Sequence, residues 1–265
     1  MKPVDFAYLR PRTLQEALAA LATHADAKLM AGGQTLGPML NLRLAQPATV
    51  IDITRIAELG RVTEEPDAVT IGAIVTHAAI EDGRSVDPTG GFLARVAHGI
   101  GYRAVRVRGT IGGSLAHADP AADWVSCFSV LGAEVAIAGQ SGLRRVPVAQ
   151  FMRGALDTAL APGEILTGVR IARPSPAARF GYSKFCRKEG EFADAIGAAL
   201  FDPDRRIFTL AASTPAGAPQ VISRDRPFEA GEIPSLLATA AVGDAYAQRL
   251  REIVLKRALQ EASAP

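Results

Sequence analysis

The sequence has little cysteine. Only Cys127 and Cys186 occur in 265 residues, and they lie far apart. Without a CxxC pair, the chain has too few thiolates for a zinc ribbon or an iron–sulfur cluster. Two thiols in a chain of this size are typical of a reducing compartment. We therefore expect a cytoplasmic protein with no metal centre of its own.

The sequence also lacks an excess of charge of one sign and a long apolar run. Lys and Arg total 29 against 27 Asp and Glu, which gives a formal net charge of +2. This balance predicts no nucleic-acid partner. The densest basic stretch carries Arg103, Arg106 and Arg108, which we interpret as the solvent face of a short element. No apolar run reaches the roughly 18 residues that a membrane-spanning helix needs, so we expect no membrane span.

Three familiar motifs are missing as well. The chain has no GxGxxG, no GxxxxGK[ST] and no GxSxG, which argues against a Rossmann site, a P-loop NTPase and a serine hydrolase. The stretch "HADPAAD" offers His117, Asp119 and Asp123 as conceivable metal ligands. Its spacing favours capping instead, because Asp119 followed by Pro120 is a good helix start.

Glycine, in contrast, gathers in two segments, "AGGQTLGP" (31–38) and "GTIGGSLAHADP" (109–120). Backbone N–H groups of successive glycines can converge on an anion, and glycine lets the backbone approach a pyrophosphate closely. Thr35, Thr110 and Ser114 add hydroxyl donors. Each segment follows a strand-like stretch. We interpret the two segments as two sides of one site for a dinucleotide-like ligand.

Local patterns predict an α+β protein. The capping box "TLQE" predicts a helix over about 13–23. Short strands at 28–31 and 48–53 form a β–α–β unit around the first glycine segment. The other elements expected in this half are strands within 60–75, a short helix that Thr76 begins, a helix around 89–99, a hairpin at 133–148 and a strand at 164–172.

The stretch "RPSPAA" (173–178) breaks this pattern and marks the best domain boundary. Beyond it we expect three antiparallel strands within 180–222. A helix over about 243–262 would then end the sequence. Its predicted apolar face consists of Tyr246, Leu250, Ile253 and Val254.

Two long stretches, "LMAGGQTLGPMLNLRLAQPATVIDI" (29–53) and "VRVRGTIGGSLAHADPAADW" (105–124), closely resemble the FAD-binding medium subunits of the molybdenum hydroxylases. That family includes xanthine dehydrogenase and aerobic carbon monoxide dehydrogenase. The stretches 182–200 and 244–259 resemble its C-terminal domain. The resemblance implies the vanillyl-alcohol-oxidase (PCMH-type) fold, with two α/β FAD-binding subdomains at 1–57 and 58–174. A C-terminal domain of antiparallel sheet and helix would occupy 178–265.

The same resemblance implies which residues contact a non-covalent FAD. The first pyrophosphate loop would comprise Leu29, Met30, Ala31, Gly32, Gly33, Gln34, Thr35 and Leu36. The second would comprise Thr110, Ile111, Gly112, Gly113 and Ser114. The remaining contacts implied are Asp123 and Asp119 to the ribityl or pyrophosphate region, Leu166, Lys184 and Ile100 to the isoalloxazine ring, and Phe192 over the flavin face. From the residues alone, Leu166 and Phe192 could equally be core, and Lys184 a solvated face. No catalytic residue or metal ligand is implied.

By this resemblance the chain is one electron-transfer subunit of a larger oxidoreductase. A large subunit would carry molybdopterin and a small subunit two [2Fe–2S] clusters, in a dimer of heterotrimers. FAD would pass electrons to NAD, a quinone or oxygen, and Lys184 would favour the anionic reduced flavin. Two alternatives stay open, a stand-alone FAD-dependent oxidoreductase of the same fold and a non-catalytic phosphate-ligand-binding protein. The first alternative needs its own acid or base, and of the four histidines only His117 lies near a glycine segment in the sequence.

Overall fold

A small parallel sheet forms the N-terminal part of the protein. The computed structural model describes residues 1–240 and 243–264. The sheet order is β1 (Ala7–Leu9), β3 (Thr49–Asp52) and β2 (Ala27–Met30), with helices α1 (Leu14–Thr23) and α2 (Leu36–Asn41) as connections. The β–α–β unit expected around the first glycine segment is therefore confirmed, and β1 adds a strand that the sequence did not predict.

The capping box at the start of α1 forms in part. The Thr13 hydroxyl accepts a hydrogen bond from the Glu16 N–H at 3.2 Å, as predicted. The Glu16 carboxylate, however, accepts from the N–H of Arg12 at 2.8 Å rather than from that of Thr13. Both bonds satisfy donors near the helix start, so the predicted helix and its Thr13 cap are confirmed, and only the reciprocal bond from Glu16 is displaced by one residue.

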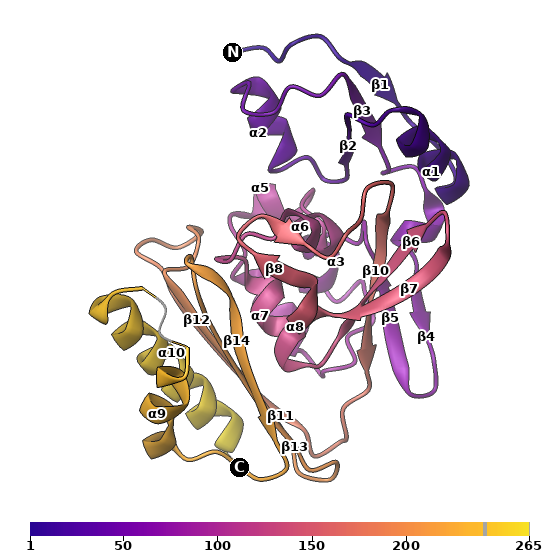
Figure 1. Ribbon diagram of the computed structural model, residues 1–265. Helices are drawn as coiled ribbons and strands as arrows, with labels where there is room; N and C mark the ends of the chain where they lie inside the picture. The colour runs from indigo at the N-terminus through magenta and orange to yellow at the C-terminus, as the bar shows by residue number, and fades with distance from the viewer. Residues whose placement is uncertain (241–242, 265) are drawn as a thin grey trace.

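An antiparallel sheet of five strands forms the middle of the chain (Figure 1). Its order is β4 (Val62–Glu64), β5 (Ala68–Gly72), β10 (Ile165–Ala172), β6 (Glu134–Gly139) and β7 (Gly142–Pro147). Between β5 and β6 the chain forms α3 (His77–Glu81), α4 (Phe92–His98), α5 (Arg103–Arg106), α6 (Ile111–His117) and α7 (Asp123–Val130). The short elements α8 (Val148–Phe151), β8 (Met152–Gly154) and β9 (Asp157–Thr158) lie between β7 and β10. Thr76 caps α3 through a hydrogen bond from Ala79, as the sequence predicted.

Two predictions about this middle part are wrong. Asp119 does not begin a helix, because α7 starts only at Asp123. The Asp119 carboxylate instead accepts from the Ala121 N–H two residues on, at 2.9 Å, in a local turn. The second glycine segment does not follow a strand. It follows α5, and its Gly112 and Gly113 lie in the first turn of α6.

The C-terminal part is a four-stranded antiparallel sheet covered by helices. Three of its strands were expected, and β14 was missed. The elements in chain order are β11 (Arg179–Phe185), β12 (Ala195–Asp202), β13 (Ile207–Thr214), β14 (Gly217–Arg224), α9 (Ile233–Ala238) and α10 (Ala245–Ser263). Leu250 and Val254 are buried on the face of α10 that packs on the sheet, whereas Tyr246 is exposed. The predicted apolar face is therefore correct only in its inner turns.

The middle and C-terminal sheets share one hydrophobic core. Helix α7 packs between them, and Figure 1 shows α9 and α10 on the opposite face of the four-stranded sheet. Trp124 and Phe128 of α7 are fully buried and stack at 4.9 Å between ring centroids. Leu200 and Ala211 of the C-terminal sheet belong to the same cluster. In the part of the chain described here, no helix has the length and apolar character needed to cross a bilayer.

Candidate functional site

One groove of about 650 Å³ is lined by all three parts of the chain. The N-terminal part contributes residues 29–36, which run from the end of β2 to the start of α2. The middle part contributes the second glycine segment and Leu166 of β10, and the C-terminal part contributes Lys184 and residues 190–192. The structure thus brings together the residues that the sequence predicted for the cofactor. Ile111 is the exception, because it is fully buried in the core and does not line the groove.

The first glycine segment offers free backbone donors to this groove. Gly33 has φ +70°, a conformation that favours glycine. Among the described residues, no protein acceptor receives a hydrogen bond from the backbone N–H of Gly33, Gln34 or Thr35. These donors lie at the carboxyl end of β2, where the chain turns into α2. The arrangement has the donors that an anionic group such as a pyrophosphate requires.

The second glycine segment uses its glycines differently. The N–H of Gly112 donates to the Ala73 carbonyl at 2.9 Å, and the N–H of Gly113 donates to the Thr110 hydroxyl at 3.1 Å. A Cβ on Gly112 would lie 2.6 Å from that of Ala73. The prediction that these amides form a second anion nest is therefore wrong. Gly112 serves close packing of α6, while Gly113 and Ser114 present their surfaces to the groove.

The two glycine segments touch each other directly. A Cβ on Gly32 would lie 1.9 Å from the carbonyl oxygen of Arg108, so only glycine fits at this position. The Arg108 Nε also donates to the Gly32 carbonyl at 3.3 Å. This backbone-to-backbone contact fixes the first segment against the second along one side of the groove.

An ion pair lies where the middle and C-terminal parts meet at the groove. The Lys184 Nζ on β11 donates to both carboxylate oxygens of Asp123, at 3.0 and 3.2 Å. The Tyr182 hydroxyl donates to the same carboxylate at 2.6 Å. Burial raises the pKa of Asp123, and the Lys184 charge and the Tyr182 hydroxyl oppose that rise. Lys184 is therefore neither a solvated strand residue nor an unpaired cation, because its charge is matched within the site.

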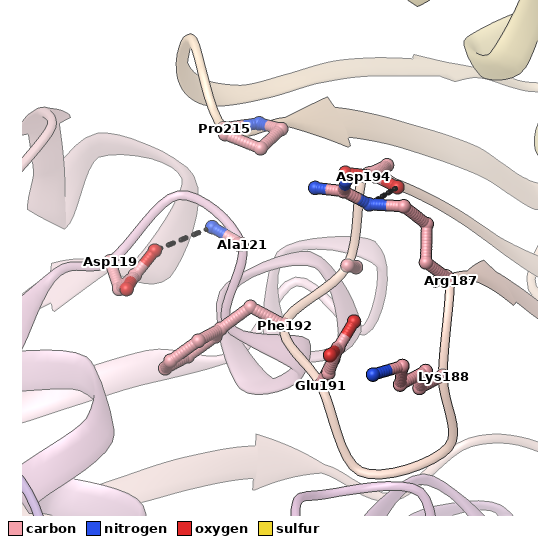
Figure 2. A pocket seen from close by; sticks show the side chains of 9 residues that line it. Asp119, Ala121, Arg187, Lys188, Glu191, Phe192, Asp194 and Pro215 are labelled. Atoms are coloured by element: carbon pink, nitrogen blue, oxygen red, sulfur yellow. Dashed lines mark hydrogen bonds and ion pairs between the residues drawn. The ribbon is translucent and has the colours of Figure 1, made fainter.

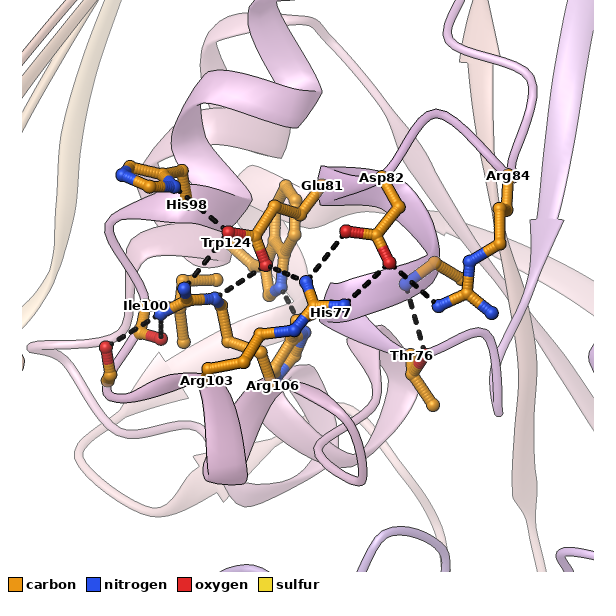
Figure 3. A network of polar contacts seen from close by, with 12 residues as sticks. Thr76, His77, Glu81, Asp82, Arg84, His98, Ile100, Arg103, Arg106 and Trp124 are labelled. Atoms are coloured by element: carbon orange, nitrogen blue, oxygen red, sulfur yellow. Dashed lines mark hydrogen bonds and ion pairs between the residues drawn. The ribbon is translucent and has the colours of Figure 1, made fainter.

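Cationic side chains also hold the backbone that precedes α5. Lys184 donates to the carbonyl of Gly99 at 3.1 Å, and Arg106 donates to those of Ile100 and Gly101 at 3.1 and 2.9 Å. Glu81 of α3 accepts two hydrogen bonds from Arg106, at 2.7 and 2.9 Å (Figure 3). The pKa of Glu81 is lowered to about 2, and the hydrogen bond from Arg106 is the largest cause of this shift.

Arg106 therefore does not lie on a solvent face, as its basic stretch suggested. Only 8% of it is exposed. Its side chain spans from Glu81 to two carbonyls of residues that line the groove. The interpretation that fails for Arg106 holds for its neighbours Arg103 and Arg108, which are exposed. A buried arginine needs several acceptors, and these acceptors come from segments that the local pattern does not reveal.

The groove has a further polar residue that the sequence did not single out, His77. Its ring packs against Gly109, where a Cβ would lie 2.9 Å from the ring Nε2. The Trp124 indole N–H donates to the ring Nδ1 at 2.9 Å. Only His117 lies near a glycine segment in the sequence, but His77 lies beside Gly109 in space. The sequence offered one local signal for the place of His77. The cap expected at Thr76 puts His77 in the first turn of a helix.

Phe192 lines both the groove and a second, open hollow of about 620 Å³. Figure 2 shows Phe192 on the loop between β11 and β12, with the charged side chains of Arg187, Lys188, Glu191 and Asp194 around this hollow. Phe192 is 66% exposed, which excludes the interpretation that it is a core residue. Leu166, in contrast, is 5% exposed and packs in the core while it also lines the groove.

Comparisons with known families and sequences agree with one another. The family model described as "FAD binding domain in molybdopterin dehydrogenase" matches residues 4–174. The caffeine dehydrogenase subunit beta of Pseudomonas sp. strain CBB1 is 36% identical over 210 residues, which cover 78% of this chain and 71% of that protein. The carbon monoxide dehydrogenase medium chain of Hydrogenophaga pseudoflava is 37% identical over 196 residues, which cover 74% of this chain and 68% of that one.

Solved structures show the same relationship over the whole chain. Carbon monoxide dehydrogenase from Hydrogenophaga pseudoflava superposes with a TM-score of 0.88 and 29% identity, over 99% of this chain and 98% of that one. Quinoline 2-oxidoreductase from Pseudomonas putida 86 gives a TM-score of 0.85, also at 29% identity, over 99% and 98% of the two chains. The similarity therefore includes the C-terminal sheet and helices as well as the segment that the family model matches.

Proposed function

Because the chain belongs to the family of FAD-binding domains of molybdopterin dehydrogenases, we propose that it transfers electrons as the FAD-carrying medium subunit of a molybdenum hydroxylase. The observation that carries the proposal is the groove with free backbone donors at Gly33, Gln34 and Thr35. Its residues fit FAD, because a long cofactor with a pyrophosphate needs anion-binding amides at one place and apolar walls elsewhere. The groove supplies such walls through Leu29, Leu166 and their neighbours.

When bound, FAD supplies a centre that accepts and donates electrons. The protein's own residues would bind and orient it. We propose that the amides of residues 33–35 hold the pyrophosphate and that Gly113 and Ser114 border it. Leu166, Ile100, Lys184 and Phe192 would contact the ring system, as the resemblance implies. Asp119 and Asp123 would lie near the ribityl or pyrophosphate region.

The ion pair changes the role proposed for Lys184. An unpaired ammonium would favour the anionic reduced flavin, but Asp123 accepts from this ammonium at 3.0 Å. The pair brings no net charge to the groove, and it acts on a bound ring as a dipole. We therefore propose that the main task of Lys184 is to hold Asp123 and the Gly99 carbonyl in place.

The electron donor and the acceptor lie outside this chain in our proposal. A small subunit would carry [2Fe–2S] clusters and a large subunit molybdopterin, in a dimer of heterotrimers located in the cytoplasm. The acceptor would be NAD, a quinone or oxygen. No three His, Cys, Asp or Glu side chains form a potential metal site within the described residues, and two cysteines cannot hold two such clusters. We also propose the domain division 1–57, 58–174 and 178–265.

The decisive experiment is a visible absorption spectrum of the purified chain before and after addition of FAD, with the released flavin identified. The proposal expects a non-covalent FAD at about one molecule per chain. A chain that stays colourless, even when it is co-expressed with iron–sulfur and molybdopterin subunits, would favour a phosphate-ligand-binding protein. Reduction of the bound FAD by an organic substrate without any partner subunit would favour the stand-alone oxidoreductase.

A further inference from the structure

The imidazole of His77 is a buried group that lines the groove without an assigned role. His77 begins α3, and its backbone N–H donates to the Gly109 carbonyl at 2.9 Å. The residue is 5% exposed, and it lines the groove together with Ala73, Gly109 and Gly112. The ring thus lies on the floor of the groove, next to the place where the two glycine segments touch.

The contact with Trp124 fixes the protonation of this ring. An indole N–H can only donate, so the ring Nδ1 that lies 2.9 Å from it must accept (Figure 3). An Nδ1 that accepts carries no proton, and the neutral ring then holds its proton on Nε2. Burial, together with the smaller effect of the Arg106 charge, lowers the pKa of His77 to about 4. The ring is therefore a neutral N–H donor at physiological pH.

The Nε2–H of His77 has no acceptor among the described residues. The side-chain hydrogen bonds of His77 consist of the one from Trp124. Gly109 lies over Nε2, and any larger residue there would cover the atom, because its Cβ would come within 2.9 Å. Nε2 is not among the fully buried polar atoms that lack a partner in the described part of the chain, so this N–H still reaches the groove. Its acceptor is therefore supplied by what fills the groove, either a water molecule or an oxygen of a ligand that replaces that water.

We propose that His77 is a cofactor-binding residue whose Nε2–H donates a hydrogen bond to an oxygen of the FAD that fills the groove. This inference rests on the FAD site described above and adds a residue to it. It also gives Gly109 a reason to be glycine, since the missing side chain leaves Nε2 open. Trp124 is then a positioning residue, because it selects the tautomer that presents a donor to the groove.

A matched pair of substitutions separates the two sides of the ring. His77→Asn keeps an acceptor near the position of Nδ1 for Trp124 but has no atom at the position of Nε2. His77→Gln places an amide N–H near the position of Nε2 but gives up the contact with Trp124. The readout is the dissociation constant of FAD, measured with the full apo-chain by flavin fluorescence. His24→Asn, which does not line the groove, is the control.

We expect His77→Asn to raise the dissociation constant of FAD about five- to twentyfold, the size of one lost hydrogen bond. His77→Gln should stay within about threefold of the unchanged chain, and so should His24→Asn. Equal weakening by the Asn and Gln variants would assign the ring a structural role only. Weakening by Gln alone, or by neither variant, would overturn the proposal too. Failure of the unchanged chain to bind FAD would instead contradict the cofactor assignment itself.

A second measurement needs no variant, in case the substitutions prevent folding. Nitrogen-15 labelling of histidine reports which ring nitrogen carries the proton and whether that N–H is hydrogen-bonded. His77 should keep its proton on Nε2 between pH 6 and pH 8, and the Nε2–H proton should shift downfield when FAD saturates the chain. An unchanged His77 Nε2–H signal at saturation, or a proton on Nδ1, would overturn the proposal.

Discussion

Single glycines in this protein serve two distinct physical purposes. Gly33 adopts a positive φ and presents a free amide to the groove. Gly32, Gly109 and Gly112 are small because another group occupies the space of a Cβ. The first purpose creates a binding surface, and the second brings segments of the N-terminal and middle parts close enough to shape it. Both produce the same glycine-rich pattern in the sequence.

The contact at Gly32 predicts a large effect of one methyl group. Gly32→Ala would place a Cβ 1.9 Å from the Arg108 carbonyl oxygen, so the two segments must separate. We expect unfolding to require about 1–3 kcal/mol less free energy and FAD to bind at least about tenfold more weakly. Urea unfolding and FAD titration measure the two effects.

The matched control for this substitution lies five residues away. A Cβ on Gly37 meets no atom within 4 Å, and Gly37 belongs to α2. Gly37→Ala should leave FAD affinity unchanged and should alter stability by less than about 1 kcal/mol, in the stabilising direction. Equal effects of the two substitutions would contradict the role given to the Gly32 contact.

Removal of Lys184 should reveal the buried Asp123. Lys184→Met leaves that carboxylate without its cation, which we expect to cost about 3–5 kcal/mol of stability at pH 8. Without the cation, the pKa of Asp123 in the folded chain rises further above its ordinary value of 3.8. The folded state then binds the proton more tightly than the unfolded state, so the stability of the variant falls as pH rises through this window.

The measurement is urea unfolding of the Lys184→Met variant and the unchanged chain at pH 5 and pH 8. The penalty should be larger at pH 8, and adding Asp123→Asn to the variant should recover part of it. Lys256→Met is the control, because that partly exposed lysine lies 4.0 Å from Glu252 and should contribute less than about 0.5 kcal/mol. An identical penalty at both pH values would argue against a buried, titrating Asp123.

At the scale of elements, two short helices beside the groove are joined by an ion pair, in addition to the apolar side chains that α3 buries. Helices α3 and α5 have five and four residues, too few to be stable by themselves. Glu81 of α3 joins them through Arg106, which also holds two carbonyls beside the groove. The pair therefore connects the stability of the two helices to the shape of the binding site.

The Glu81 pair predicts a defined pH dependence. The pKa of this carboxyl is about 2 in the folded chain against an ordinary value of 4.5. Its stabilising effect is thus complete above pH 4.5 and is lost as pH falls toward 2. Glu81→Gln should lower the free energy of unfolding by about 1–3 kcal/mol at pH 7 and weaken FAD binding.

The test compares the Glu81→Gln variant with the unchanged chain in urea at pH 7 and pH 3. The difference between them should shrink at pH 3, because the unchanged chain has then lost part of the same contribution. Asp225→Asn serves as control, since its pair with Arg206 is exposed and should be worth less than about 0.5 kcal/mol. A difference that stays constant with pH would show that the Glu81 charge does not stabilise the fold.

At the scale of the whole molecule, one hydrophobic core crosses the boundary at 173–178, although the C-terminal sheet and helices also enclose a cluster of their own. Trp124 and Phe128 before it form one cluster with Leu200 and Ala211 after it. The groove is also lined by residues from all three parts of the chain. Both features connect the parts energetically, so a ligand in the groove should stabilise the molecule as a unit.

We expect the middle and C-terminal parts to unfold in one cooperative transition. Trp124, the single tryptophan, reports on the shared core through its fluorescence, and far-UV circular dichroism reports on all elements. The two probes should give coincident urea curves for the apo-chain. Free FAD at one hundred times its dissociation constant should raise the free energy of unfolding by about 2.7 kcal/mol. Separate transitions, or no effect of FAD, would contradict this coupling.

Local patterns in the sequence determined much of this protein. Capping residues, apolar periodicity and breaks at proline and glycine predicted most helices and strands, because each depends on neighbours within a few residues. The two glycine segments predicted the groove in which we propose that FAD binds, and the resemblance they carry identified the family. A local prediction failed where two local interactions compete for the same side chain. At Asp119, a turn with Ala121 replaced the expected helix cap.

Only the tertiary structure decided how the buried polar groups are paired. His77 meets Trp124 and Gly109, Lys184 meets Asp123, and Arg106 meets Glu81, each across 25 to 61 residues of sequence. A group buried away from water must take its partner from the surrounding packing, whatever the distance along the chain. Short-range patterns contain no record of that packing. The sequence therefore determined where the groove forms, and the fold decided which donors and charges line it.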